Sequence, residues 1–439
     1  FPFAGSSYYG NQDGFFTQAK VNQGRSIALM QNTGAKFDYP RGIAVDSSGN
    51  VYVADTNNCV IKKILPTKQV ISIAGRYIYT DATSALTTNP WNSSAPDIAA
   101  NNRPGGLATF RQPWDIVLNH DETALFVSDK GHNCIKKIDL SSADYHVSVI
   151  GGVINQAGNV VGDLATSRFY SPLAMAYWKD PNSSAESLYV GDMNNGLVYH
   201  INLSLNTSDS NYISLAKGNS TALFPGSYPS MYQIEGLAVC PENLSIFASG
   251  YGDHTIKRLD NNGAITTIAG LSGTSGTTNG SGTSARFKNP AGLSSKGMTS
   301  STSGCLYLAD MDNGTIRKID ISNGGLSNPT VSTIMGEGSN KKTQDGSNDT
   351  LTTLNDGIKG PYFRAPYGID FQGSTDSGDM YVSDRMDAVI RKHDKSKDPT
   401  RTLVWSGAVN LSGNSLSHDA YITNDVGNTR FKKTIIDSN

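Results

Sequence analysis

The stretch GIAVDSSGNVYVADTNNCVIKKI, residues 42–64, contains three short apolar segments separated by polar turns. Alternating apolar residues bounded by Gly, Asn and Asp predict three antiparallel β-strands. A lone three-stranded ribbon is marginally stable in water because it cannot bury its own apolar face. The stretch therefore needs further sheets to pack against, and related segments are to be sought elsewhere in the 439-residue chain.

The same pattern recurs along the chain. The segment YVAD at 52–55 returns with small changes at 126–129, 189–192, 247–250, 307–310 and 381–384. Each copy follows an apolar segment, usually led by Pro, and precedes a segment such as VIKKI or CIKKI. A fourth segment such as VISIAG ends each unit. Self-similarity of this kind indicates a repeat fold.

Four strands per unit predict a four-stranded antiparallel blade, and six blades arranged radially form an all-β, six-bladed β-propeller. We expect a single propeller over residues 1–439, with 1–36 as an N-terminal closing strand and loop and 408–439 as a C-terminal extension. The predicted blades cover residues 37–75, 110–152, 169–218, 231–270, 287–336 and 363–407.

The units resemble NHL repeats, in which the third strand reads I-R-K-I and the fourth ends in A-G. The resemblance rests on segments such as 42–64 and 265–293, and it covers the chain from Phe1 to about Gly407. The fourth unit departs most, with Ile234 in place of the Pro and Gly250 in place of the Asp. The resemblance implies the fold and says little about function, because propellers host many unrelated activities.

Two segments match the strand that closes the ring. FPFAG at 1–5 resembles the end of the fourth strand, and TLVWSG at 402–407 follows the third strand of the sixth unit. Whichever segment does not close the ring is spare. A spare strand either frays or lies along an outer edge, or it pairs with a neighbouring molecule and links subunits into a fibre. The sequence leaves this choice open, as it does the question of whether the chain is an excerpt of a longer protein.

An Asp ends the second strand of five units: Asp55, Asp129, Asp192, Asp310 and Asp384. A ring of carboxylates around a cation is one interpretation. Asp at a strand end also accepts backbone N–H groups and shapes turns, and we assign these residues that turn-forming role. A basic pair, Lys62 and Lys63 in the first unit, recurs on the third strand. We expect the stems of these basic residues to cover blade surfaces while their charges reach water.

No catalytic residues, metal ligands or cofactor site are predicted. The resemblance extends to amidating lyases, propellers that bind a metal in the central channel through several His residues. Here none of the seven His residues falls on the predicted innermost strands. Asp115 and Asp370 do lie there, which is too little to assign an acid and base pair. The near balance of 36 Lys and Arg with 38 Asp and Glu gives no sign of nucleic-acid binding.

The four cysteines allow three pairings. Cys59 and Cys134 are expected at the start of the third strands of blades 1 and 2, which are adjacent. Cys240 is expected at the end of the first strand of blade 4 and Cys305 at the start of the second strand of blade 5, near the same turn. Because each pair would join neighbouring blades, we predict the disulfides Cys59–Cys134 and Cys240–Cys305. Four unconnected thiols are the alternative.

Glycosylation sequons favour a secreted or cell-surface protein. The candidates are Asn92, Asn182, Asn202, Asn206, Asn219, Asn243, Asn279, Asn348 and Asn410. A further sequon at Asn313 lies inside a tight repeat turn and is a poorer candidate.

We therefore expect a non-enzymatic, extracellular binding or scaffold propeller without a cofactor, including a glycosylated structural subunit that assembles through its spare strand. Loops around 77–112 and 337–365, with the turns between second and third strands, are expected to recognise protein or glycan partners. These loops carry Trp91, Tyr77, Tyr79 and Tyr362, residue types enriched in interfaces. No apolar run reaches the roughly 20 residues that span a membrane. The alternative is a metal-dependent lyase or hydrolase with its site in the central channel.

Overall fold

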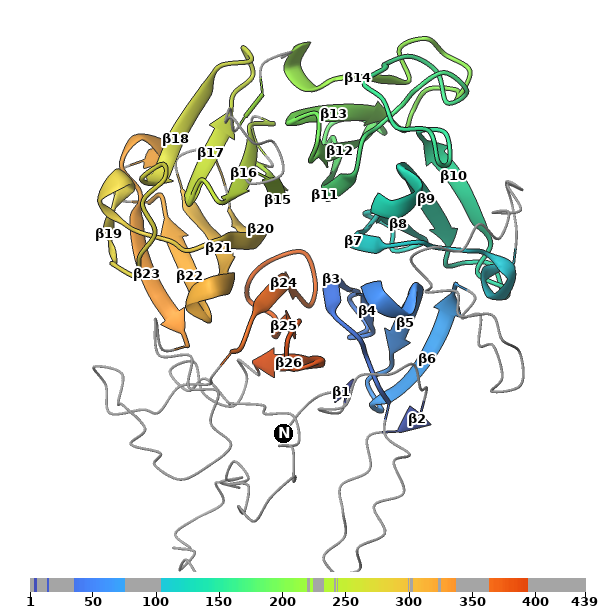
Figure 1. Cartoon of the computed structure of the whole chain (residues 1–439), viewed down its shortest axis with the longest axis horizontal. Helices are drawn as coiled ribbons and strands as arrows, with labels where there is room; N and C mark the ends of the chain where they lie inside the picture. The colour runs from blue at the N-terminus through green and yellow to red at the C-terminus, as the bar shows by residue number, and fades with distance from the viewer. Residues whose placement is uncertain are drawn as a thin grey trace, which may run out of the picture.

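A computed structural model of the chain describes residues 4–5, 14–15, 35–75, 104–218, 222–223, 233–240, 242, 244–298, 300, 303–322, 325–336 and 363–393. Within these residues, six antiparallel sheets stand around a common axis as the blades of a ring (Figure 1). The predicted all-β, six-bladed propeller is confirmed. None of the helices in the described part is long and apolar enough to cross a membrane.

The first three blades each contain four sequential strands. Blade 1 contains β3 (Pro40–Val45), β4 (Val51–Asp55), β5 (Val60–Ile64) and β6 (Gln69–Ala74). Blade 2 contains β7 (Pro113–Leu118), β8 (Ala124–Asp129), β9 (Cys134–Asp139) and β10 (Val147–Gly151). Blade 3 contains β11 (Pro172–Lys179), β12 (Glu186–Asp192), β13 (Leu197–Asn202) and β14 (Ile213–Leu215).

The second half of the ring follows the same plan. Blade 4 contains β15 (Gln233–Val239), β16 (Ile246–Tyr251), β17 (Thr255–Leu259) and β18 (Ile265–Gly270). Blade 5 contains β20 (Pro290–Met298), β21 (Gly304–Asp310), β22 (Thr315–Asp320) and β23 (Thr330–Met335). Blade 6 contains β24 (Pro366–Phe371), β25 (Met380–Asp384) and β26 (Val389–His393). Short 3-10 turns lie between strands: η1 (Thr56–Asn58), η3 (Gly105–Leu107), η4 (Lys130–His132), η5 (Ala216–Gly218), η7 (Gly282–Ser284), η8 (Met311–Asn313) and η9 (Gly325–Ser327).

The N-terminal segment closes the ring. Strand β1 (Ala4–Gly5) pairs antiparallel with β26, Ala4 opposite Ile390 and Gly5 opposite Val389. The strand that pairs with the outer edge of β26 therefore comes from the start of the chain, and the predicted extent of the sixth blade, 363–407, stays a prediction beyond His393. The competing copy at 402–407 lies outside the described residues. Two short strands, β2 (Gly14–Phe15) and β19 (Gly280–Ser281), add a fifth strand to blades 1 and 5.

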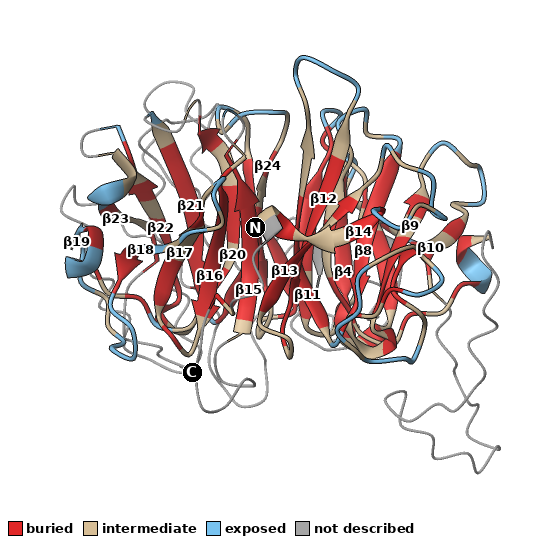
Figure 2. Ribbon diagram, turned by 90° about the horizontal axis from the view of Figure 1, so that it is seen from above, coloured by how far each residue is buried: buried red, intermediate tan, exposed pale blue. Residues whose placement is uncertain are grey.

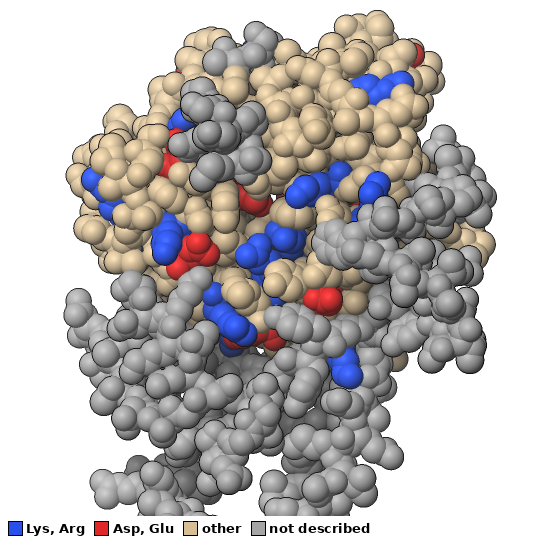
Figure 3. Space-filling view, viewed as in Figure 1, with Lys and Arg blue, Asp and Glu red and all other residues tan. Residues whose placement is uncertain are grey.

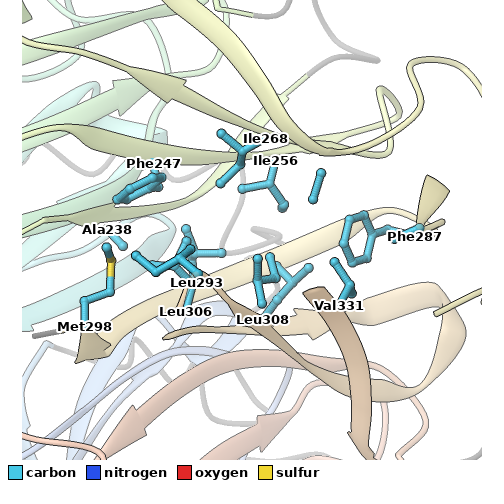
Figure 4. Packing of buried hydrophobic residues seen from close by; sticks show 14 of the residues in the cluster. Ala238, Phe247, Ile256, Ile268, Phe287, Leu293, Met298, Leu306, Leu308 and Val331 are labelled. Atoms are coloured by element: carbon cyan, nitrogen blue, oxygen red, sulfur yellow. The ribbon is translucent and has the colours of Figure 1, made fainter. Parts of the chain in front are cut away.

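Apolar side chains pack between neighbouring blades. Figure 4 shows one such cluster, in which Phe247 and Ile256 of blade 4 face Leu306 and Leu308 of blade 5. Alternation along each strand supplies both faces of a blade, since successive side chains point to opposite sides. Buried residues run along the strands, and exposed ones concentrate in the connections (Figure 2). Each blade is thus stabilised by both neighbours.

The first strand of every blade lies nearest the axis and contacts the first strands on either side (Figure 1). Each of these strands begins with a register shift, between Pro40 and Ile43 in blade 1 and at equivalent places elsewhere. Gly42 lies within this shift, and a Cβ there would lie 2.6 Å from the Cα of Asp115. Adjacent backbones therefore meet too closely at this point for a side chain. A bulge of this kind redirects the neighbouring side chain.

Candidate functional site

The recurring Asp at the end of the second strand holds the loop that leads into its blade. Asp55, Asp129, Asp192, Asp310 and Asp384 are all fully buried. Asp55 accepts the backbone N–H of Asp38 at 2.7 Å, and Asp310 accepts that of Lys288 at 2.8 Å. The same bond recurs at Asp129, Asp192 and Asp384, always from the residue that follows a Phe. These carboxylates fix the entry loop of the blade rather than the turn alone.

The first residue of each basic pair behaves differently from the prediction. Lys62, Lys136, Arg317 and Arg391 are buried, and their charges meet the Asp of the same blade at 2.7–3.4 Å. Each also lies 4.9–5.5 Å from the ring of the entry-loop Phe. Blade 4 lacks the repeated Asp, and Lys257 instead pairs with Asp253 at 3.6 Å. The prediction that these charges reach water is wrong for these residues. Each cation is held inside because the buried Asp of its blade requires a nearby cation or hydrogen-bond donors.

Neither predicted disulfide is present in the structure, which corrects the pairings Cys59–Cys134 and Cys240–Cys305. Cys240 packs between blades 4 and 5, whereas Cys305 packs between blades 5 and 6. The alternation of β21 places Cys305 on the face of blade 5 that points away from Cys240. Cys59 lies in a left-handed turn before β5, with Sγ 3.5 Å from the carbonyl of Arg111. Cys59 therefore lies before the third strand of its blade, and the predicted start of that strand at Cys59 is one residue too early.

Part of the predicted glycosylation set can be placed. Asn182, Asn206 and Asn279 are exposed, Asn202 is half-buried, and Asn313 is buried. The remaining candidates lie outside the described residues: Asn92, Asn219, Asn243, Asn348 and Asn410. The aromatic residues Trp91, Tyr77, Tyr79 and Tyr362 of the predicted recognition loops also lie outside them.

The central channel contains a cavity of about 480 Å³ lined by the first strands. Asp115 accepts the N–H of Met175 at 2.8 Å, and Asp370 accepts that of Val45 at 2.8 Å, so each joins two adjacent blades. Burial raises the pKa of Asp115 to about 7. Lys296 pairs with Asp370 at 2.8 Å. Among the described residues, no group of three or more His, Cys, Asp and Glu side chains is placed to hold a metal ion.

At one end of the channel, side chains from all six blades form what we term the axial mouth. Its inner ring contains the residue that follows the Pro of each first strand, or follows Ile234 in blade 4, next to the register shift: Arg41, Trp114, Leu173, Glu235, Ala291 and Tyr367. Its outer ring contains the residue that follows the second strand, or Tyr251 at the end of β16: Thr56, Lys130, Met193, Tyr251, Met311 and Arg385. Trp114, Leu173, Ala291 and Tyr367 of the inner ring pack in one cluster with Met193 and Met311 of the outer ring.

Cations stack on the aromatic rings of the axial mouth. The guanidinium carbon of Arg41 lies 3.4 Å from the ring centre of Trp114, and Lys130 Nζ lies 4.1 Å from it. Arg385 lies 5.9 Å from the Tyr367 ring. In the view down the ring axis, Lys and Arg side chains gather around the centre with fewer acids among them (Figure 3). Such contacts strengthen when they are removed from water.

Glu235 is the carboxylate of the inner ring, and its hydrogen bonds are taken by neighbours. Trp114 Nε1 donates to it at 3.2 Å, and the Tyr367 hydroxyl donates a short hydrogen bond to the same oxygen. Burial lowers the pKa of Lys130 to about 8; Glu235 opposes this shift and Arg41 adds to it. The axial mouth therefore holds three cations and one engaged carboxylate.

The sequence interpretation missed the axial mouth although a signal was present. The repeat keeps Pro at the start of the first strand and Asp at the end of the second, while the residues beside them differ from blade to blade. Positions that carry the scaffold stay similar within such a repeat, and the variable positions beside them are free to take up recognition. Comparing the copies at these two places would have indicated both rings.

Comparison with known proteins agrees with this architecture. A family model of the NHL repeat matches residues 37–64. The chain is 24% identical over 309 residues to the protein SUPPRESSOR OF QUENCHING 1, chloroplastic, of Arabidopsis thaliana. The match covers 66% of this chain and 26% of that protein, so the chain spans about a quarter of the relative's length.

Solved structures show the same fold at low identity. An auxiliary nutrient binding protein from Bacteroides thetaiotaomicron is 15% identical with a TM-score of 0.55, over 89% of this chain and 75% of that one. An auxiliary nutrient binding protein from Bacteroides ovatus is 13% identical with a TM-score of 0.54, over 89% and 75%. At these identities the likeness concerns the fold alone. The ring of six blades makes the chain a six-bladed β-propeller, and its first blade carries an NHL repeat over residues 37–64.

Proposed function

We propose that this chain is a non-enzymatic binding propeller whose recognition surface is centred on the axial mouth. The observation that carries this proposal is the stacking of three cations, Arg41, Lys130 and Arg385, on the aromatic rings of Trp114 and Tyr367. Stacked cations and aromatic rings recognise ligands without bond-breaking chemistry.

We further propose that the protein works outside the cell, as a glycosylated binding or scaffold subunit for protein or glycan partners. Exposed sequons at Asn182, Asn206 and Asn279 support this location, because a glycan needs a solvent-facing asparagine. Assembly through a spare strand remains part of the proposal. Strand β1 occupies the outer edge of β26, so the copy at 402–407 is the segment proposed to pair with a neighbour.

Metal analysis tests the absence of catalysis against the alternative of a metal-dependent lyase or hydrolase. The full chain is purified without chelators, dialysed against metal-free buffer, and analysed for transition metals and alkaline-earth ions. We expect no ion at a stoichiometric level. One zinc, calcium or manganese ion retained per chain would contradict the non-enzymatic proposal and direct attention to the channel.

Peptide mapping by mass spectrometry tests the proposed location. Protein from its native source is digested without reduction, before and after enzymatic removal of glycans. We expect glycans on at least one of Asn182, Asn206 and Asn279, and the buried Asn313 serves as the internal control that stays bare. Unmodified asparagine at all three exposed sequons would contradict an extracellular glycoprotein.

A further inference from the structure

We propose that the axial mouth binds an organic anion in which a carboxylate adjoins an apolar body. This inference rests on the proposed binding function and names the ligand class of the same site. It follows from the distribution of charge around the two rings, from buried nitrogen donors that lack an acceptor, and from the apolar side chains opposite them.

The cations of the axial mouth are confined to one half of it. Arg41 comes from blade 1, Lys130 from blade 2 and Arg385 from blade 6, three blades that are adjacent in the ring. Trp114 and Tyr367, on which these cations stack, come from blades 2 and 6. An electropositive half with low-polarity walls attracts an anion from solution.

Two guanidinium groups carry a donor without a partner. The Nε atoms of Arg41 and Arg385 are buried and have no hydrogen-bond acceptor among the described residues. A buried donor without a partner is unfavourable, so an acceptor is expected from a ligand or water. A carboxylate matches the planar donor edge of a guanidinium through Nε and one Nη. Glu235 does not fill this role, because it accepts hydrogen bonds from Trp114 and Tyr367 and neither arginine Nε donates to it.

The other half of the axial mouth is apolar. Leu173 and Met193 come from blade 3, and Ala291 and Met311 from blade 5. Tyr251 of blade 4 packs against the same cluster and is partly exposed. Methionine adapts to ligand shape because its side chain is unbranched and polarisable. Leu173, Ala291 and Met311 are buried, so a ligand that places its carboxylate over blades 6, 1 and 2 would rest its apolar body on Tyr251 and the edge of Met193 across the axis.

Isothermal titration of the full chain with 4-phenylbutyrate tests the assignment, with 4-phenylbutyramide as the uncharged probe of the same shape. We expect saturable binding of the acid and at least tenfold weaker binding of the amide, as for a lost charge-assisted hydrogen bond. A tetraglycyl-phenylalanine peptide with a free carboxyl end distinguishes two sources of the group. Tighter binding of the peptide indicates a protein C-terminus, and weaker binding indicates a small organic acid.

Variants locate the binding to the mouth. Arg385→Gln is expected to weaken binding of the acid about tenfold, with Lys130→Gln a second variant in case the first unfolds. Arg385→Lys should retain part of the affinity, since it keeps the charge and loses the planar fork. Lys137→Gln, a half-buried cation on β9, is the control and should bind as the native chain does.

Equal binding of acid and amide would overturn the inference, as would an equal loss of affinity in Lys137→Gln and Arg385→Gln. So would inorganic phosphate that competes as strongly as 4-phenylbutyrate. The last would remove the apolar body from the assignment. A folded chain that binds none of the probes would also overturn it. None of these outcomes alters the metal and glycan results that test the proposed function, so the two failures are distinguishable.

Discussion

Blades 2 and 3 are neighbours with the same strand order, yet they hold the repeated Asp by different means. In blade 2, Asp129 accepts Lys136 Nζ at 2.9 Å and His132 Nδ1 at 2.7 Å, besides two backbone N–H groups. In blade 3, Asp192 has Tyr199 where blade 2 has the lysine, and it accepts the Tyr170 N–H and the Asn195 amide. One repeat position is therefore compatible with a buried ion pair and with hydrogen bonds alone.

The two arrangements move the pKa of the carboxyl group in opposite directions. Burial acts to raise the pKa of Asp129, but the charges of His132 and Lys136 outweigh it and hold this pKa well below its usual range. Burial raises the pKa of Asp192 to about 7 against the hydrogen bonds from Tyr170 and Asn195, because no cation compensates. The difference teaches that in these two blades the position supplies an acceptor, whereas the charge around it is a local choice.

Asparagine at the two positions should give the largest difference. Asp129→Asn leaves the nearly inaccessible Lys136 without its carboxylate, and we expect the free energy of unfolding to fall by about 3–5 kcal/mol. Asp192→Asn removes no ion pair and keeps an acceptor for the Tyr170 N–H, so we expect a change within about 1 kcal/mol. Urea denaturation at pH 8, followed by circular dichroism, measures both. Equal losses in the two variants would show that the cation of blade 2 contributes nothing specific.

The pH dependence of stability should separate the two carboxyl groups next. Asp192 binds its proton more tightly when folded, so its contribution is complete below about pH 4 and declines as pH rises towards 7. Asp129 has a lowered pKa, so its contribution is present above about pH 4 and is lost on acidification. We expect the native chain to lose about 2 kcal/mol relative to Asp192→Asn between pH 4 and 7. A difference that stays constant over this range would contradict the raised pKa.

The fold was largely predicted from the sequence, and the axial mouth was missed although the repeat copies carried a signal for it. The recurring Pro and Asp, with alternating apolar residues between them, indicated the blades because strand pairing and blade packing are set by these local patterns. The burial of Lys62 and Arg317 was missed because a basic pair on a strand is usually assigned to solvent, and only the fold brings the carboxylate to it. Ring closure pairs β1 (Ala4–Gly5) with β26, which lies far along the chain, and no local pattern decides such a pairing.

A lysine in blade 3 should make it behave like blade 2. Tyr199→Lys places an ammonium near Asp192 and removes the contact between the Tyr199 and Phe169 rings, whose centres are 5.0 Å apart. We expect a net loss of about 1–2 kcal/mol at pH 8, because the new ion pair offsets part of the lost packing. The pH dependence from Asp192 should reverse in sign. Tyr199→Met is the matched control, because it loses the ring without adding charge, and it should retain the native pH dependence of stability. The same pH dependence in Tyr199→Lys and Tyr199→Met would contradict the role given to the cation.

A smaller difference between the two blades lies one residue before the Asp. Ser128 of blade 2 donates its hydroxyl hydrogen to the Leu173 carbonyl of blade 3, whereas blade 3 has Gly191 at the equivalent place, packed under Ile234. Ser128→Ala should lower the free energy of unfolding by about 1 kcal/mol, the usual value for one neutral hydrogen bond. Ser249→Ala, which removes the same bond from blade 4 to Ala291, should cost a similar amount. Gly191 shows that the equivalent position in blade 3 needs no hydroxyl. A loss well above about 1 kcal/mol in Ser128→Ala would therefore mean that Ser128 has a second role. That role would be to order the β7 bulge beside Trp114, because the Ser128 hydroxyl oxygen also accepts the Asp115 N–H.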